Sequence, residues 1–107
     1  MAKNTVDPII LSIINKYLQK VREFGIPVEK AILFGSYAKG IADKYSDVDL
    51  CVVSNQFGKD SHQELLTLLK LTDKETVDIE PHPYSPKDLE NKWDSLANEI
   101  VNFGIVI

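Results

Sequence analysis

The sequence lacks any long apolar run and has almost no cysteine. No stretch of about 18 consecutive apolar residues occurs among its 107 residues, so we expect no transmembrane helix and no membrane partner. Cys51 is the single cysteine, which excludes an internal disulfide and a zinc site built from several thiolates. It stands in an apolar run, where a small buried side chain is expected. The residues before Asp7 form no apolar signal-peptide core, and the sequence therefore predicts a soluble cytoplasmic protein.

Basic residues are also scarce. Lysine and arginine together number 12 against 16 acidic residues, the net charge is −4, and Arg22 is the only arginine. Proteins that bind a nucleic-acid backbone usually carry a basic stripe and a high isoelectric point. This balance argues against DNA or RNA as a direct partner. It favours an acidic cluster that recruits a divalent cation.

Apolar residues are present in the proportion of an ordinary globular protein. They make up 44% of the sequence, and charged residues make up 26%. The length fits one folding unit, and no repeat, low-complexity tract or linker interrupts it. We therefore expect a single domain over residues 1–107.

Cap and turn residues divide the first half of the chain into a helix and two strands. Asp7-Pro8 is typical of a helix start, and Gly25 is typical of a helix end. Short apolar runs predict buried strands over residues 30–34 and 47–53. Between them, residues 37–41 have room for one or two turns of helix.

The second half continues the alternation. Ser61 is expected to cap a helix, with Glu64 completing a capping box. A strand over residues 76–80 should end at the two prolines that follow, because proline cannot donate to a sheet ladder. Ser85-Pro86 predicts the start of one last helix that continues to Gly104. Its expected buried stripe consists of Leu89, Trp93, Leu96, Ile100 and Val101. Residues 105–107 are a short apolar tail.

The resulting order αβαβαβα predicts an α/β (α+β) fold. In such a fold a small mixed sheet is covered by helices, and we expect two layers.

The first segment that carries chemistry follows the strand at residues 30–34. Gly35-Ser36 comes directly after the strand and directly before a helix. Glycine allows a ligand close to the backbone, and the free N–H groups of a helix start attract phosphate. The Ser36 hydroxyl can add a hydrogen bond to a phosphate oxygen. Lys39 lies one helical turn further on, where its ammonium group can reach the same anion.

The second segment is Asp47-Val48-Asp49. Residues two apart on a strand point to the same face, so the two carboxylates lie together while Val48 faces the core. Two adjacent carboxylates repel each other unless a cation lies between them. Magnesium commonly binds one or two carboxylates together with substrate phosphates. A phosphate-binding turn beside such a pair indicates phosphoryl or nucleotidyl transfer.

Gly35-Ser36, ten further residues and then Asp47-Val48-Asp49 resemble the G-S-x10-D-x-D signature of the polymerase-β-like nucleotidyltransferases. The short chain is similar to their minimal nucleotidyltransferase (MNT) group over nearly its whole length. The resemblance implies two Mg²⁺ ions held by three acidic residues and a nucleoside triphosphate, ATP for preference, as substrate. Asp47 and Asp49 would hold the metals. Gly35, Ser36 and Lys39 would bind the nucleotide.

The resemblance requires a third carboxylate from the next strand, and two candidates exist. Asp78 resembles the aspartate of a V-D-hydrophobic strand in many relatives. Glu80 stands in a stretch that resembles the I-E-P-x-P of an MNT subgroup, and we favour Glu80 slightly. Either one could help to deprotonate the attacking oxygen. His82 is expected to be a turn residue, with nucleotide binding or proton transfer as the alternative.

The resemblance also implies a partner. MNT proteins often pair with a HEPN-domain toxin, usually a ribonuclease, and some silence it by transferring AMP to a tyrosine. The predicted function is thus an Mg²⁺-dependent nucleotidyltransferase that acts as an antitoxin. The alternative is a non-catalytic module that neutralises its partner by contact. Transfer to a small molecule is a third hypothesis, and template-directed polymerisation is disfavoured by the acidic charge.

Overall fold

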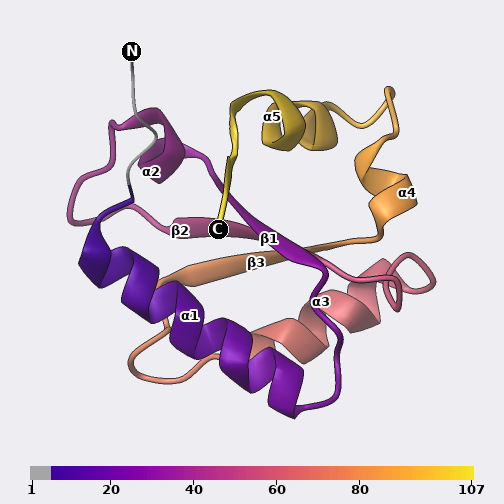
Figure 1. Cartoon of the computed structure of the whole chain (residues 1–107), viewed down its shortest axis with the longest axis horizontal. Helices are drawn as coiled ribbons and strands as arrows, with labels where there is room; N and C mark the ends of the chain where they lie inside the picture. Colours follow the sequence, from indigo (N-terminus) through magenta and orange to yellow (C-terminus); the bar gives the residue numbers. More distant parts are fainter. Residues whose placement is uncertain (1–5) are drawn as a thin grey trace.

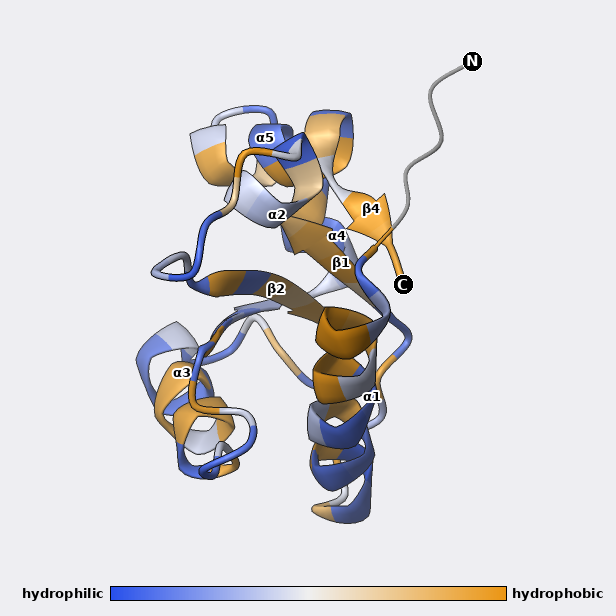
Figure 2. Cartoon of the chain, turned by 90° about the vertical axis from the view of Figure 1, so that its left-hand side faces the viewer, coloured by the Kyte–Doolittle hydropathy of each residue, from blue (hydrophilic) through white to orange (hydrophobic). Residues whose placement is uncertain are grey.

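A computed structural model describes residues 6–107, which form a four-stranded sheet with helices on both faces (Figures 1 and 2). In chain order the elements are α1 (Pro8–Glu23), β1 (Lys30–Phe34), α2 (Ser36–Lys39), β2 (Val48–Val53), α3 (Ser61–Lys70), β3 (Ile79–Tyr84), α4 (Pro86–Leu89), α5 (Ser95–Phe103) and β4 (Ile105–Val106). Within residues 6–107, no helix is both long and apolar enough to cross a bilayer.

The strands are arranged in the order β3-β2-β1-β4. β1 runs antiparallel to β2 and β4, whereas β2 and β3 are parallel. The expected mixed α/β sheet is confirmed. The strand β4 was not expected. Residues 105–106, which were predicted to be an apolar tail, pair with Ile32 and Leu33 of β1.

The sheet separates two apolar cores. On one face α1 and α3 pack their buried side chains, such as Tyr17 and Leu68, against Leu50. On the other face α4 and α5 cover Ile32 and Cys51 (Figure 2). The molecule therefore has three layers rather than the expected two. The physical reason is that β1 and β2 are apolar at almost every position, so both of their faces need cover.

Cys51 is fully buried in the second core, as predicted. Burial raises the pKa of its thiol to about 12. A thiol in that environment stays protonated and unreactive.

The N-cap of α1 is Asp7, as predicted, but the cap of α3 is not Ser61. Asp60 takes that place, and its carboxylate accepts a hydrogen bond of 3.1 Å from the Gln63 N–H. The Glu64 carboxylate reaches back to the N–H groups of residues 58, 59 and 60. A reciprocal cap exists, but it begins one residue earlier because the aspartate is the stronger acceptor.

β3 continues through both prolines, so the prediction that they end the strand was wrong. Val48 N–H donates to the Asp78 carbonyl and Ser54 N–H donates to the Tyr84 carbonyl, at 2.8 and 3.0 Å. The backbone groups of the even-numbered residues of β3 therefore face β2. The nitrogen atoms of Pro81 and Pro83, which carry no hydrogen, face the open edge of the sheet. No hydrogen bond of the sheet is therefore lost at these residues.

The single helix expected from Pro86 to Gly104 is two helices. The Asn91 side chain accepts from the Trp93 N–H, and Asp94 caps α5 by accepting from the Ala97 N–H. These two side chains hold a turn between α4 and α5. Two members of the expected buried stripe consequently face outward, with Trp93 95% and Val101 58% exposed.

Candidate functional site

The turn after β1 and the first residues of β2 and β3 meet on the face of the sheet that α5 covers. Asp49 lies opposite Phe34, the last residue of β1, and opposite Glu80 on β3. Gly35 and α2 follow directly after Phe34 (Figure 1). Segments that are far apart in the sequence are thus neighbours in space.

Gly35 has a backbone conformation and a position that only glycine fits. Its φ of 73° and ψ of −150° lie in a region that side chains avoid. A Cβ at this position would overlap the Asp49 carboxylate and would lie 3.1 Å from its Cγ. The turn therefore brings bare backbone against Asp49, and Ser36 begins α2 immediately after it.

Asp49, Glu80 and His82 form a compact group of possible metal ligands. One donor atom from each side chain lies within 4.8 Å of the others. His82 Nε2 is 3.7 Å from both Asp49 Oδ1 and Glu80 Oε1. These distances are too long for hydrogen bonds. His82 Nε2 is buried and has no hydrogen-bond partner among the described residues.

The electrostatic environment of Asp49 is that of a partly buried acid among other acids. Burial raises the pKa of its carboxyl group, and the nearby His82 imidazole opposes the shift. The charges of Asp47 and Glu99 raise the pKa further. A bound cation would remove this accumulated repulsion, because it favours the ionised form of each carboxylate.

The two candidates for the third carboxylate are both exposed but differ in position. Glu80 lies beside Asp49 within β3, whereas Asp78 precedes β3. Asp47 immediately precedes β2 and is exposed. The structure therefore brings Glu80 to Asp49, and it leaves Asp47 and Asp78 at the open end of the two strands.

His82 is not the turn residue that the sequence suggested. It lies within β3, and its ring packs edge-on against Phe34 with the ring centroids 5.0 Å apart. The error follows from the two flanking prolines, which normally mark the end of a strand. Because the strand continues, the alternation of side chains puts His82 on the same face as Glu80.

Lys39 has a partner that the sequence did not indicate. Its Nζ lies 3.8 Å from Glu99 Oε1 on α5, so this ion pair links α2 to α5 above the site. Sequence reasoning missed Glu99 because no motif contains it. The only available signal was its place in α5 between the buried residues Ala97 and Ile100.

A cleft of about 580 Å³ adjoins His82. It lies along β3 and is lined by residues that include His62, Tyr84 and Asp94. The Tyr84 hydroxyl donates a 2.9 Å hydrogen bond to Asp94. Burial is the main cause that raises the pKa of Tyr84, and the hydrogen bond to the Asp94 carboxylate adds to it, so the phenol stays neutral.

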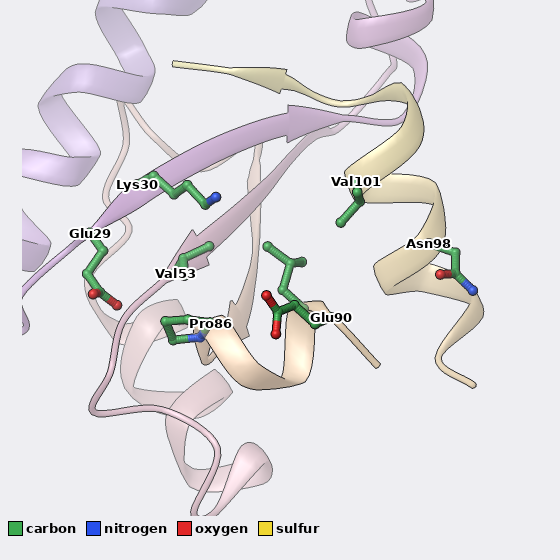
Figure 3. Close-up of a pocket in the computed structure, with 8 residues that line it drawn as sticks. Glu29, Lys30, Val53, Pro86, Glu90, Asn98 and Val101 are labelled. Atoms are coloured by element: carbon green, nitrogen blue, oxygen red, sulfur yellow. The ribbon is translucent and has the colours of Figure 1, made fainter. Parts of the chain in front are cut away.

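A somewhat larger cleft, of about 650 Å³, lies near the other end of β2 (Figure 3). Lys30, Val53, Glu90 and Val101 are among its lining residues, and none of the predicted site residues belongs to it. The larger cleft is thus separate from the acidic group.

The donor set around Asp49 fits a divalent cation. Two carboxylates and an imidazole nitrogen converge, and the nitrogen lacks any other partner among the described residues. Backbone without a side chain lies against the group at Gly35, and the Asp49 carboxylate fills the position that a Cβ would take. The arrangement suits a metal-assisted reaction at a phosphate.

Comparison with known proteins agrees with this geometry. Residues 14–103 match the family model described as "Nucleotidyltransferase domain". A protein of Methanocaldococcus jannaschii named "Putative protein adenylyltransferase" is 36% identical over an alignment of 91 residues, and the alignment covers 80% of this chain and 62% of that protein. The chain thus spans less than two thirds of that relative's length.

A crystal structure titled as that of a "putative nucleotidyltransferase" from Sulfolobus solfataricus superposes with a TM-score of 0.64. The superposition covers 98% of this chain and 90% of that one. At 12% identity it bears on the fold alone.

Proposed function

Because the chain belongs to the nucleotidyltransferase domain family, we propose that it transfers AMP from ATP to a hydroxyl group of a partner protein in the cytoplasm. The observation that carries the proposal is the contact between a side-chain-free turn at Gly35 and the carboxylate of Asp49, with Glu80 beside it. In this proposal the Gly35 turn receives the phosphates, and the acidic group beside it receives the cations. The name of the Methanocaldococcus relative supports a protein acceptor.

In this proposal Asp47, Asp49 and Glu80 hold Mg²⁺, two ions by resemblance to the family. When bound there, the cations would neutralise the charge that develops on the transferred phosphate. The Gly35 turn admits the triphosphate, and the Ser36 hydroxyl donates to a phosphate oxygen. Lys39 lies at the other end of α2, where its ammonium group can exchange Glu99 for a phosphate oxygen.

The chemical step is an in-line displacement at the α-phosphorus. The acceptor oxygen forms the new bond, the bond to the bridging oxygen breaks, and pyrophosphate leaves. The proton of the acceptor hydroxyl passes to a carboxylate, for which Glu80 is well placed beside Asp49. Asp78 is the alternative base.

For the acceptor we propose a tyrosine of a HEPN-domain toxin, which makes the chain an antitoxin. The support is the resemblance of the Gly35-Ser36 and Asp47-Val48-Asp49 motifs to the MNT group. The addition of AMP brings charge and bulk to an RNA-binding surface. A contact-only antitoxin is the competing proposal, and it requires no turnover at Asp49.

The test uses the purified chain, Mg²⁺ and host lysate with ATP labelled at the α- or the γ-phosphate. We expect a protein band that carries only the α-label, with the mass of the acceptor. Label from the γ-position would indicate a kinase instead. A labelled small molecule would replace the protein acceptor. The absence of label with ATP, GTP, CTP and UTP would favour the contact-only antitoxin.

Two matched variants test the assignment of the third carboxylate. Glu80→Gln should reduce transfer by about 100-fold or more, in the range of a lost acid–base or metal-binding group. Asp78→Asn removes the same charge two residues away and should stay within about 3-fold of wild type. The opposite order would assign the third carboxylate to Asp78.

A further inference from the structure

The metal site of this chain contains a nitrogen donor in addition to its carboxylates. We propose that His82 is a metal ligand, and that the group Asp49, Glu80 and His82 binds a first-row transition dication such as Mn²⁺ more tightly than carboxylates alone would. The proposal rests on the proposed function, since it concerns the same site. It goes beyond that function because it names a ligand and a metal preference of this particular chain.

The His82 imidazole is mostly buried. Its Nε2 is inaccessible to solvent and has no hydrogen-bond partner in residues 6–107. A buried polar atom without a partner is unfavourable and needs an explanation. The side chain is only 23% exposed. A metal ion at this point would give the nitrogen the partner that it lacks.

The three donor atoms have the spacing that ligands of one ion require. Nε2 lies 3.7 Å from Asp49 Oδ1 and 3.7 Å from Glu80 Oε1, so the three donors surround a common point without bonding to one another. Donors that bind one ion at about 2.1 Å are separated by about 3 to 4 Å. Hydrogen bonds from His82 Nε2 to the two carboxylates would have left no space for an ion between the three donor atoms.

The His82 ring is held in place by its packing. The His82 ring packs edge-on against Phe34 at an interplanar angle of 64°. Phe34 is itself buried and lies opposite Asp49 in the sheet. A ligand whose orientation is fixed before binding loses little entropy on binding.

The chemical class of the cation follows from the donors. Carboxylates alone suit Mg²⁺, whereas an imidazole nitrogen favours transition metals, with affinity rising from Mn²⁺ to Cu²⁺ and falling again at Zn²⁺. The resemblance to the family accounts for oxygen ligands only. An imidazole ligand at this position would therefore shift the metal preference of the site towards transition dications.

The test measures binding of metal to the full chain without nucleotide. Free Mn²⁺ is followed by electron paramagnetic resonance during titration of metal-free protein, and Mg²⁺ binding is followed by competition. His82→Gln should weaken Mn²⁺ binding by about 10-fold or more, because loss of a direct ligand should cost at least as much as loss of a residue that only orients one, and should change Mg²⁺ binding by less than about 3-fold. His62→Gln is the matched control, because His62 is exposed and lies outside the group. Equal Mn²⁺ binding by wild type and His82→Gln would overturn the proposal.

A second measurement needs no variant. Pulsed electron paramagnetic resonance of Mn²⁺ bound to the wild-type chain should show coupling to an imidazole nitrogen, and absence of that coupling would overturn the proposal. The two proposals fail separately. Nitrogen coupling without nucleotide transfer would overturn the proposed function alone, whereas transfer without nitrogen coupling would overturn the role of His82 alone.

Discussion

The carboxylate of Asp49 occupies the space where a Cβ of residue 35 would lie. This relationship joins the two halves of the sequence motif, because the turn after β1 and the second strand are built around each other. The positive φ of Gly35 and the position of Asp49 are thus parts of one arrangement. Each can be tested by substitution.

Gly35→Ala should abolish nucleotide transfer, because the new methyl group would displace Asp49. Gly40→Ala is the matched control, since Gly40 also has a positive φ but a methyl group added there would have no neighbouring atom within 4 Å. Both variants should lose about 1 kcal/mol or more of unfolding free energy from backbone strain. Only Gly35→Ala should lose activity. Chemical denaturation and the transfer assay would measure both, and equal activity of the two variants would contradict the prediction.

Glu99→Gln should strengthen nucleotide binding. The substitution releases Lys39 from its ion pair and removes a negative charge close to Asp49. An exposed pair is worth about 0.2–1 kcal/mol, so the KM for the nucleotide should fall by roughly 1.5- to 5-fold. Lys39→Gln should raise the KM for the nucleotide.

The control for this pair is Glu75→Gln. It breaks the 2.7 Å ion pair between Glu75 and Lys16, and neither residue belongs to the site. Its KM should equal that of wild type. A KM for the nucleotide that is higher in Glu99→Gln than in wild type would contradict the prediction. It would show that the ion pair positions Lys39 for phosphate binding.

Glu64 should make the stability of the chain depend on pH in the acid range. Partial burial alone would raise the pKa of its carboxyl group, but hydrogen bonds from the N–H groups of Gly58, Asp60 and Lys59 together lower it. A lowered pKa in the folded state stabilises the protein above the ordinary glutamate pKa of about 4.3. That contribution is lost as the pH falls through the folded-state value.

Urea unfolding of wild type and Glu64→Gln at several pH values would measure this effect. The variant should be less stable than wild type at pH 7, and the difference should shrink as the pH falls below about 4. A difference that does not change with pH would mean that the carboxylate charge contributes nothing to the cap.

Trp93 should contribute little to stability although it is the largest side chain in the sequence. It is 95% exposed, so Trp93→Ser should change the unfolding free energy by less than about 0.5 kcal/mol. Ile100→Ala, at a position that is 1% exposed in the same segment, should cost about 2–5 kcal/mol. Circular dichroism during urea unfolding would measure both. Protection of Trp93 fluorescence from iodide in wild type would contradict its exposure.

The sequence predicted the order of the main elements because local signals mark them strongly. Asp7-Pro8 begins α1, the apolar run at residues 30–34 forms β1, and Ser85 caps α4. It also predicted that Asp49 and Glu80 would lie on sheet faces, since alternation along a strand is a local property. Which strands pair is not local, and so the contact of Asp49 with Glu80 required the structure.

The errors have the same origin. Two prolines normally end a strand, but Pro81 and Pro83 lie on an open sheet edge that only the strand order reveals. The helical spacing of apolar residues from Leu89 to Ile100 predicted one continuous helix. The side chains of Asn91 and Asp94 instead accept backbone hydrogen bonds that interrupt it. The second face of the sheet needed its own helices because both faces of β1 and β2 are apolar.

The sequence by itself determined the chemistry available to this chain: a glycine turn, an alternating pair of aspartates and a choice of third carboxylate. Residue type and spacing along one strand are sufficient for that. Only the tertiary structure decided that Glu80 rather than Asp78 lies beside Asp49, that His82 joins them and that Glu99 holds Lys39. Those contacts depend on the register between β2 and β3 and on the packing of α5, which are set by burial of two apolar faces at once.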